Sequence, residues 1–459
     1  MLNADTREFT FTSEFDGLEI SAVIAVPSGN INGVVQIVHG MNEYKERYFP
    51  FMDYLASEGF VSVIHDNRGH GKSIVKEEDL GFMYRNGGMG FVEDIAQLTR
   101  RVRANYPTYP YFLVGHSMGS LGARCFLKEH DAEINGLIVM GCPCYSRFSG
   151  FARSVDSAVS KRLGSRFRSE KIYEISEKTL NKRFTKAGET TPRSWICSDK
   201  EVVNAFNSDP LCSFRYTLNG YESLLWLMRE TYSKKGWRVS NPKLPIRFIS
   251  GRDDPCMLSE KKFFEAMSVL ENVGYTSISH RFFDGMRHEI LNEKNNMNVY
   301  KDIAKTLYSW IDRLQELAVE IQVPTEGEAV PAVNEVPAPV QEAVPEARPA
   351  AEQRPAQQTA IPADADVFDI LEAVQPDGTA PIMEAAPAPS SINIDIPAEA
   401  PAESKVGSEV LEILESVPES DHTDIPQEEP ELEPAEQVKA AAAEVLDLIE
   451  AAESGIMPQ

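Results

Sequence analysis

The stretch that decides the fold reads Tyr111-Phe-Leu-Val-Gly115-His116-Ser117-Met118-Gly119-Ser-Leu-Gly-Ala-Arg-Cys-Phe-Leu127. The apolar residues before Gly115 predict a buried strand, and the residues after Gly119 predict a helix. A serine on a sharp strand-to-helix turn needs small residues two positions before and after it, because larger side chains would clash there. The start of the helix also directs backbone N–H groups toward the negative charge that develops when a serine attacks a carbonyl. The pattern therefore predicts that Ser117 is a nucleophile.

Apolar runs that suit strands alternate with helical patterns on both sides of this turn. The predicted strands are residues 34–38, 61–64, 111–114, 136–140, 246–250 and 277–283, preceded by two alternating strands within residues 8–26. The predicted helices are residues 49–59, 91–104, a helix from residue 121 onward and one at about 298–317. This order favours an α/β fold with a mostly parallel central sheet and helices on both faces.

The alternation is interrupted between residues 145 and 241, where helical and aromatic segments occur without the pattern of a buried strand. Such an insertion predicts a helical cap over the strand ends, where open α/β sheets bind ligands. The aromatic residues of the cap suit either an apolar pocket or the cap's own core. Residues 147–193 carry 12 Lys and Arg against five Asp and Glu, which suits either peripheral contact of the basic cap with a membrane surface or a solvated face.

The composition changes sharply near residue 320. Residues 321–459 hold 30 Asp and Glu against four Lys and Arg, together with 19 of the 29 Pro. This tail therefore contributes −26 to the net charge of −25, and the rest of the chain contributes +1. A segment with so little apolar mass and so much like charge is expected to be disordered. The sequence thus predicts a folded domain at residues 1–320 and a largely disordered Ala/Pro/Glu-rich acidic tail at residues 321–459.

The tail contains three short amphipathic repeats at residues 367–374, 410–417 and 445–452, which read VFDILEAV, VLEILESV and VLDLIEAA. In each repeat apolar residues fall at positions i, i+3, i+4 and i+7, which lie on one face of a helix, with acids at i+2 and i+5. Each repeat is too short to be a stable helix alone in water. The pattern favours docking into an apolar groove with a basic rim, on a protein partner or on the chain's own cap. The alternative is sequence drift in a spacer that only aids solubility.

A nucleophilic serine needs a general base, and the chain has eight His residues. In folds with this kind of turn the order along the chain is serine, acid, histidine, which leaves His280, His288 and His422. His280 lies within a predicted strand and His422 within the tail. His288 lies in a loop after the last predicted strand, from which it can reach across the strand ends. The order therefore favours His288 as the base.

The acid is expected in the loop Gly251-Arg252-Asp253-Asp254-Pro255, which follows the predicted strand 246–250. Two carboxylates compete there. Pro255 restricts the residue before it to extended conformations, so Asp254 has the stiffer backbone. A fixed carboxylate holds an imidazole in the required tautomer. Asp254 is therefore preferred, and Asp253 is interpreted as a surface partner of Arg252.

The negative charge that forms during the reaction needs a second backbone N–H, from a loop after an early strand. The motif His39-Gly40-Met41-Asn42-Glu43 follows the predicted strand 34–38. The predicted donors of this oxyanion hole are therefore the N–H groups of Met41 and Met118. Taken alone, His39-Gly40 also suits an ordinary turn.

Other classes of site and partner lack support in the sequence. It contains neither a nucleotide-binding glycine loop nor a metal-ligand cluster, so no cofactor, no metal and no nucleic-acid partner is expected. The six Cys form no paired framework. The first residues lack the apolar region of a signal peptide, and no apolar run approaches the roughly 18 residues of a membrane span. These features favour a cytoplasmic protein.

Four motifs resemble those of the monoacylglycerol lipase and lysophospholipase group of α/β-hydrolases, often classed as serine aminopeptidase-like: HGMNE at 39–43, DNRGHGKS at 66–73, GHSMG at 115–119, and DP at 254–255 with RHE at 287–289. The resemblance covers about residues 8–316. It implies the α/β-hydrolase fold, a triad of Ser117, Asp254 and His288, and a fatty-acid ester, such as a monoacylglycerol or lysophospholipid, as small-molecule substrate. Tyr44 departs from the pattern, because the family commonly has His there, and this difference concerns local loop packing.

Two other functions stay open beside ester hydrolysis through an acyl-enzyme on Ser117. An N-terminal peptidase of the same fold would need an acidic group in the cap to hold the substrate amine, and the basic cap argues against it. A partner-docking protein acting mainly through its C-terminal repeats is supported by the tail. The intact set of serine, acid and histidine argues instead for retained activity.

Deletion of residues 321–459 tests the role of the tail. We expect Ser117-dependent ester hydrolysis to survive the deletion, because all three triad residues lie upstream of it. Localisation and the set of proteins that co-purify with the chain should change if the repeats dock. A truncated protein that matches the full chain in localisation, partners and esterase rate would instead support the spacer interpretation.

Overall fold

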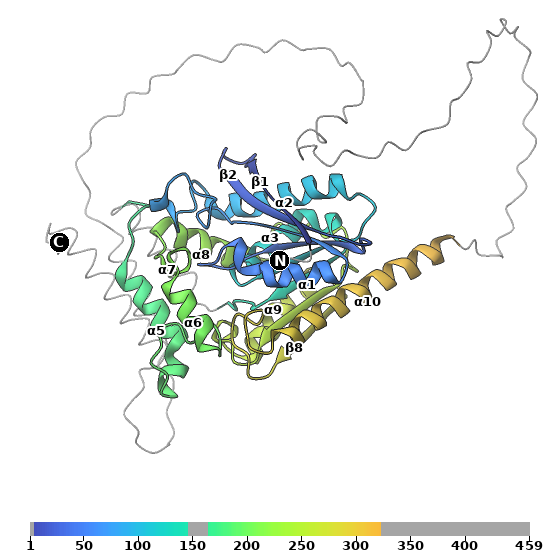
Figure 1. The fold of residues 1–459 in the computed structure, drawn as a ribbon. Helices are drawn as coiled ribbons and strands as arrows, with labels where there is room; N and C mark the ends of the chain where they lie inside the picture. The colour runs from blue at the N-terminus through green and yellow to red at the C-terminus, as the bar shows by residue number, and fades with distance from the viewer. Residues whose placement is uncertain (1–3, 146–163, 323–459) are drawn as a thin grey trace, which may run out of the picture. The chain divides into compact units, whose positions relative to one another are not determined.

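Within the residues that the structure describes, an eight-stranded sheet forms the centre of the domain (Figure 1). The structure is a computed structural model that describes residues 4–145 and 164–322. The strands are β1 (Ala4–Thr12), β2 (Glu19–Pro27), β3 (Gly33–Val38), β4 (Phe60–His65), β5 (Tyr111–His116), β6 (Gly136–Met140), β7 (Ile246–Gly251) and β8 (Ile278–Phe283). Their order is β1-β2-β4-β3-β5-β6-β7-β8; β2 runs antiparallel to both neighbours and the pairs from β4 to β8 are parallel. The expected mostly parallel sheet is confirmed.

Helices cover both faces of this sheet. The described helices of the core are α1 (Phe49–Ser57), α2 (Gly87–Asn105), α3 (Met118–His130), α9 (Glu260–Val273) and α10 (Asn296–Gln322). Side chains of α2, α3 and α9 share one hydrophobic cluster with one face of the strands. Side chains of α1 and α10 share a second cluster with the other face. The two-sided covering explains why the central strands are apolar along their whole length.

The strand β3 illustrates how the sequence builds this arrangement. Val34 and Val38 pack into the cluster of α2 and α3, whereas Val35 and Ile37 pack into the cluster of α1 and α10. All six residues of β3 are buried. Because each buried Val or Ile contributes about 1.5–3 kcal/mol, the continuous apolar run fixes the strand between two layers of helices.

The helix α2 begins four residues before its predicted start at residue 91. Its first two residues are Gly87 and Gly88, which disfavour a helix by intrinsic propensity. A Cβ atom at Gly88 would lie 2.5 Å from the Trp226 ring, and one at Gly87 would lie 2.7 Å from Ser223 Oγ. The close packing of α2 against α8 (Leu218–Tyr232) therefore requires glycine at both positions. This tertiary requirement overrides the local propensity, which is why the sequence pattern placed the start too late.

The helix α10 also extends further than predicted, to Gln322 instead of about residue 317. Its buried face includes Val299, Ile303 and Leu307, which follow helical spacing. The added residues Ala318-Val-Glu-Ile-Gln322 are apolar or good helix formers for the most part, so nothing in them stops the helix.

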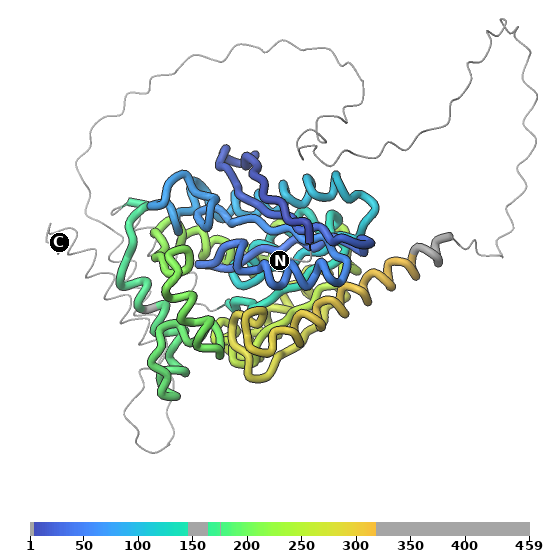
Figure 2. The backbone as a smooth tube through the Cα atoms, in the orientation of Figure 1, coloured from blue at the N-terminus to red at the C-terminus, as the bar shows by residue number. Residues whose placement is uncertain are grey.

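The connection between β6 and β7 supplies the helices of the predicted cap: α5 (Glu170–Lys186), α6 (Lys200–Ser208), α7 (Pro210–Ser213) and α8. Side chains of Ser169, Asp199 and Thr217 accept hydrogen bonds from backbone N–H groups at the starts of α5, α6 and α8. Figure 2 shows the path of α5 and α6 in green beside the sheet domain. Within the described part of this connection no strand occurs, as the aromatic and helical patterns predicted.

Several predictions from the sequence lie outside the described residues. They are the disordered tail, its repeats at 367–374, 410–417 and 445–452, and the part of the basic cap at residues 146–163. Among the helices that the structure does describe, none combines the length and the apolar character needed to cross a membrane.

The turn between β5 and α3 holds Ser117 in an unusual backbone conformation, with φ 50° and ψ −119°. Such a conformation costs a non-glycine residue about 1–3 kcal/mol and must be enforced by its surroundings. A Cβ atom at Gly119 would lie 2.1 Å from the carbonyl oxygen of Val38, and one at Gly115 would lie 2.6 Å from the carbonyl oxygen of Gly119. Gly119 therefore allows α3 to start directly against the end of β3, and Gly115 allows α3 to pack closely against the end of β5.

We expect Gly119→Ala to lower the free energy of unfolding by about 1–3 kcal/mol, because the added methyl group forces α3 away from β3. The matched control is Gly29→Ala, since a Cβ atom at Gly29 would meet nothing within 4 Å. Chemical denaturation of both variants measures the difference. Equal stabilities of the two variants would contradict the close approach described for Gly119.

Candidate functional site

The three predicted site residues lie at the carboxyl ends of parallel strands. Ser117 follows β5, Asp254 follows β7 and His288 follows β8. Carboxyl ends of parallel strands meet at one edge of a sheet, which is where open α/β sheets bind ligands. Asp254 and His288 are 2% and 3% exposed, whereas Ser117 is partly exposed. The fold therefore gathers residues that are separated by up to 171 positions in the sequence.

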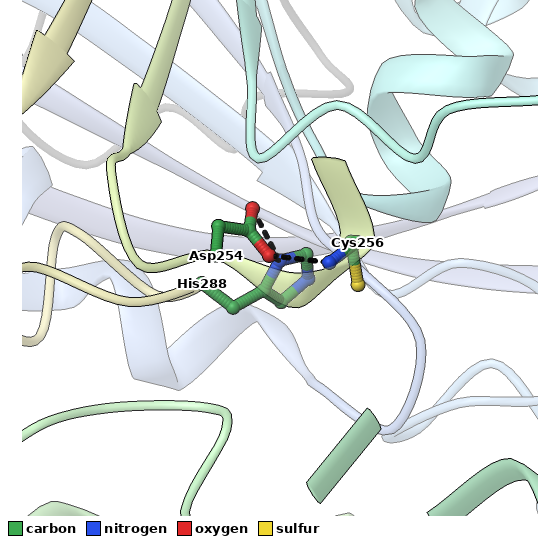
Figure 3. Close-up of side chains that lie close together, drawn as sticks. All are labelled: Asp254, Cys256 and His288. Atoms are coloured by element: carbon green, nitrogen blue, oxygen red, sulfur yellow. Dashed lines mark hydrogen bonds and ion pairs between the residues drawn. The ribbon is translucent and has the colours of Figure 1, made fainter. Parts of the chain in front are cut away.

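Asp254 and His288 form a hydrogen-bonded pair. Nδ1 of His288 lies 3.0 Å from each carboxylate oxygen of Asp254 (Figure 3). Since an ionised carboxylate only accepts hydrogen bonds, Nδ1 carries the proton and Nε2 keeps a lone pair. Burial raises the pKa of Asp254, but the attraction of His288 and the hydrogen bonds from His288 and the Cys256 N–H outweigh burial and lower it. The pair thus has the geometry that the predicted base and acid require.

Asp253, the competing carboxylate, faces away from this pair. It is half-exposed and forms an ion pair with Arg183 of α5. The predicted partner Arg252 instead pairs with Glu260 and Asp284, so the expected pairing of Asp253 with Arg252 is wrong. The reason is a tertiary contact: α5 places Arg183 next to the loop that carries Asp253. The local sequence does not indicate this contact.

Two residues beside Ser117, His116 and Gly141, lie against the ring of His288. The ring of His116, the residue before Ser117, lies 4.8 Å from the ring of His288. The N–H of Ser117 donates to Met140 O at 2.9 Å, and a Cβ atom on the following residue, Gly141, would lie 3.3 Å from His288 Cε1. Among the described residues, neither the Ser117 hydroxyl nor His288 Nε2 has a hydrogen-bond partner. Catalytic hydrogen bonds of this kind often form only when substrate is bound.

The loop after β3 lies directly beside Ser117. A Cβ atom at Gly40 would lie 3.0 Å from Ser117 Cβ. The Gly40 N–H donates to Glu43 at 2.6 Å, and His39 accepts from the Asn67 N–H at 2.9 Å, so the loop is held from both sides. The N–H groups of the two predicted donors, Met41 in this loop and Met118 at the start of α3, have no protein acceptor in the described part of the chain. They are thus available to an oxygen of a substrate, as the predicted oxyanion hole requires.

A second buried histidine–carboxylate pair lies behind His288. Nδ1 of His116 lies 2.8 Å from a Glu43 oxygen, and Nε2 lies 3.3 Å from the carbonyl oxygen of His288. Both ring nitrogens of His116 thus face acceptors, which favours the doubly protonated ring. Burial lowers the pKa of His116, but Glu43 outweighs burial and raises it; the pKa of Glu43 in turn lies below its usual value, because His116 and Arg47 outweigh burial.

Sequence reasoning missed this second pair, although both of its members lie in quoted motifs. Glu43 ends the HGMNE motif and His116 is the variable residue of GHSMG. Tyr48 donates to Glu43 at 2.9 Å, and Arg47 links Glu43 to Glu289. Burial raises the pKa of Glu289, and Arg47 opposes this effect. The usable signal was that each motif contains a titratable residue with no assigned role.

The cap contributes an aromatic wall to the site. The Trp195 ring lies 5.0 Å from the His288 ring, on a segment between α5 and α6. Its Nε1 donates to Glu177 of α5 at 3.4 Å. Tyr44, the departure from the family pattern, donates to Asp209 at the start of α7 at 2.7 Å. Tyr44 thus ties the loop after β3 to the cap.

Several basic residues of the described cap are bound within the protein. Arg166 pairs with Asp79, and Arg183 pairs with Asp253. Arg168 donates to the carbonyl oxygens of Glu78 and Leu80 at 2.8 and 2.7 Å. These contacts favour an internal, structural role for part of the basic cluster.

Asp254, Cys256 and His288 place three potential ligand atoms within 4.8 Å of one another, a grouping that could in principle hold a metal ion. In the structure the Asp254 carboxylate instead accepts hydrogen bonds from His288 Nδ1 and from the Cys256 N–H. Burial and the neighbouring Asp254 raise the pKa of the Cys256 thiol well above its ordinary value. The hydrogen bonds of Figure 3 therefore suit an acid–base pair.

Comparison with known proteins places this geometry in a family. The family model "Serine aminopeptidase, S33" matches residues 29–295, more than half of the chain. A monoacylglycerol lipase from Mycolicibacterium smegmatis is 23% identical over 311 residues, covering 68% of this chain and 99% of that protein. The phospholipase YtpA from Bacillus subtilis is 24% identical over 272 residues, covering 58% and 92%. A crystal structure of a carboxyl esterase from Bacillus coagulans in complex with glycerol matches with a TM-score of 0.62 and 26% identity, covering 67% of this chain and 99% of that one. The chain therefore belongs to the serine aminopeptidase S33 family, has the α/β-hydrolase fold and is an ester-hydrolysing enzyme.

Proposed function

We propose that this enzyme hydrolyses carboxylic esters of the acylglycerol or lysophospholipid type, through an acyl-enzyme on Ser117. The observation that carries the proposal is the oriented pair of Asp254 and His288 next to a serine on a strained strand-to-helix turn. The names of the relatives, a monoacylglycerol lipase and a phospholipase, support the substrate class. The carboxyl esterase fold neighbour supports ester chemistry in general.

The proposed mechanism uses the lone pair on His288 Nε2. This nitrogen takes the proton of the Ser117 hydroxyl while the serine oxygen attacks the ester carbonyl. The N–H groups of Met41 and Met118 then stabilise the negative oxygen. Asp254 stabilises the imidazolium that forms. His288 returns the proton to the leaving alcohol and afterwards activates the water that hydrolyses the acyl-enzyme.

The peptidase alternative requires a carboxylate in the cap that can hold a substrate amine. Glu177 of α5 lies close to the site, since it accepts from the indole of Trp195. Its carboxylate also lies 3.7 Å from Nε of Arg193. A carboxylate that already faces an arginine offers little to an amine, so the arrangement favours the esterase.

Substrate panels separate the two activities. We expect the purified full chain to hydrolyse p-nitrophenyl acyl esters and monoacylglycerols and to leave aminoacyl amides intact. A fluorophosphonate probe should label Ser117, as shown by peptide mass spectrometry. Faster turnover of aminoacyl amides than of acyl esters would replace the esterase with the peptidase, and a lack of probe labelling would remove the acyl-enzyme.

Matched substitutions test the proposed triad. We expect Ser117→Ala to lower kcat/KM for a short acyl ester by about 10⁴–10⁶-fold with the fold intact, and Asp254→Asn by about 10⁴-fold. The control Asp253→Asn should stay within about threefold, because an exposed ion pair contributes at most about 1 kcal/mol. Equal kinetics of the two Asp variants would show that Asp254 is not the acid.

The Glu43–His116 pair should make stability depend on pH. His116, whose pKa is raised on folding, stabilises the protein fully below about pH 6.5, and this effect is lost as pH rises through the folded pKa. Glu43, whose pKa is lowered on folding, stabilises it above about pH 4.3, and this effect is lost at lower pH. We therefore expect Glu43→Gln to destabilise by about 3 kcal/mol between these values and by less on either side.

Chemical denaturation at a series of pH values measures this profile. The control is Glu14→Gln, which removes an exposed carboxylate paired with Arg100. A destabilisation by Glu43→Gln that is independent of pH would contradict the ionised pair.

A further inference from the structure

A buried tyrosine of the cap lies where several segments of the site meet. Tyr216 lies just before α8 and is 1% exposed. Its hydroxyl forms a hydrogen bond with Nε2 of His70 and lies 3.7 Å from Sδ of Met118. His70 belongs to the motif at 66–73, and Met118 carries one of the two proposed oxyanion N–H groups. Through this hydroxyl the cap therefore contacts the start of α3.

The hydrogen bond between Tyr216 and His70 has a defined direction. Nδ1 of His70 lies 3.0 Å from the carbonyl oxygen of Arg68, so Nδ1 carries a proton. Burial lowers the pKa of His70 to about 4, so the ring is neutral at neutral pH and Nε2 keeps a lone pair. Burial raises the pKa of Tyr216 well above its ordinary value, although the backbone N–H of Asn42 donates to its oxygen and opposes this rise. The Tyr216 hydroxyl thus donates to His70 and accepts from Asn42.

The same piece of the cap holds the loop that carries the second proposed donor, Met41. Nδ2 of Asn42, the next residue, donates to the carbonyl oxygen of Phe214 at 2.7 Å. Asn42 adopts φ 58°, a left-handed conformation that asparagine adopts more readily than most residues. The Phe214 ring stacks on the Tyr216 ring, with centroids 5.8 Å apart. This piece of the cap therefore contacts both segments that carry the proposed oxyanion donors.

The Tyr216 ring is held tightly in place. A Cβ atom at Gly81 would lie 3.0 Å from Cδ1 of the ring, and one at Gly220 would lie 3.0 Å from Cδ2. Oγ1 of Thr217, the residue after Tyr216, donates to the carbonyl oxygen of Gly81 at 2.9 Å. Because the two glycines pack against the ring from different sides, the ring keeps one orientation and its hydroxyl one position.

We propose that Tyr216 is a positioning residue for the oxyanion hole. Its hydroxyl keeps Met118 and the loop of Met41 at the separation at which their two N–H groups can hold one oxygen. Such donors act when they lie about 2.7–3.1 Å from the developing negative charge, so a small displacement of either N–H affects the transition state more than the bound substrate. The inference rests on the proposed function, because it extends the roles proposed for Met41 and Met118.

Tyr216→Phe removes the hydroxyl and keeps the ring. Nε2 of His70 then lacks its donor, and Met118 and Asn42 lose the oxygen that both contact. We expect kcat for a p-nitrophenyl acyl ester to fall about 10- to 100-fold, less than the roughly 10²–10³-fold loss on removal of a whole oxyanion donor. KM should stay within about twofold, because ground-state contacts are unchanged. Titration of active sites with a fluorophosphonate corrects kcat for unfolded protein.

An alkyl trifluoromethyl ketone measures the oxyanion hole directly. The serine oxygen adds to the ketone carbon and leaves a negative oxygen where the transition state has one. We expect the affinity of Tyr216→Phe for this ketone to fall by the same factor as kcat. The affinity for a non-cleavable ether analogue of the substrate should stay within about twofold. A merely structural role of Tyr216 would lower the number of active sites and leave the ketone affinity of each site unchanged.

The matched control is Tyr275→Phe, which removes another buried hydroxyl. That hydroxyl lies 3.1 Å from Asp131 and 3.3 Å from the carbonyl oxygen of Leu127, at the end of α3 opposite Met118. We expect the control to keep kcat and ketone affinity within about twofold of the natural chain.

A second variant covers the case in which Tyr216→Phe does not fold. Asn42→Gly removes the hydrogen bond to Phe214 and keeps a residue that tolerates the left-handed backbone. It should lower kcat and ketone affinity in the same direction as Tyr216→Phe.

Unchanged ketone affinity in the folded variants, or an equal loss in Tyr275→Phe, overturns the proposal. A natural chain that hydrolyses no ester, but binds the ketone more tightly than Tyr216→Phe does, would contradict the proposed function and leave the role of Tyr216 standing. A natural chain that binds no ketone overturns both.

Discussion

The site depends on one close approach, between the end of β3 and the start of α3. Gly119 allows α3 to begin against the carbonyl oxygens of Val38 and His39, and Gly40 allows the loop after β3 to lie against Ser117. Both glycines thus bring the end of β3 and the loop after it into close contact with the turn between β5 and α3. The same approach therefore sets the strained backbone of Ser117 and the position of the Met41 N–H. The proposed nucleophile and one of the proposed oxyanion donors thus depend on the same packing.

Two buried histidine–carboxylate pairs lie side by side, with the rings of His116 and His288 4.8 Å apart. The two pairs differ in the hydrogen bonds that their ring nitrogens make. In the Asp254–His288 pair only Nδ1 is bound, so Nε2 can accept a proton. In the Glu43–His116 pair both ring nitrogens are occupied, one of them by the carbonyl oxygen of His288. The second pair therefore cannot act as a base. It anchors the backbone of His288, the proposed base, through the carbonyl oxygen of that residue.

Sequence patterns anticipated what local rules control and missed what tertiary contacts control. The apolar run at 34–38 located β3, and the restriction imposed by Pro255 favoured Asp254, the carboxylate that lies against His288, over Asp253. The start of α2 was misplaced, because only Trp226 explains why Gly88 is helical. The Glu43–His116 pair joins residues 73 positions apart. No spacing rule connects these two residues, and their contact appears only once β3 and β5 are neighbours.

The loop that carries His288 and the cap form one hydrogen-bonded unit. Arg287, the residue before His288, donates to Ser194 O at 2.5 Å and pairs with Glu189. The N–H of Glu289, the residue after it, donates to Ile196 O at 2.8 Å. The cap residue between these two acceptors is Trp195, which lies against the His288 ring. A change in the cap that moves Trp195 would therefore also move the backbone on both sides of His288. The position of Trp195 and the placement of His288 are coupled, because the residues on either side of Trp195 bond to the residues on either side of His288.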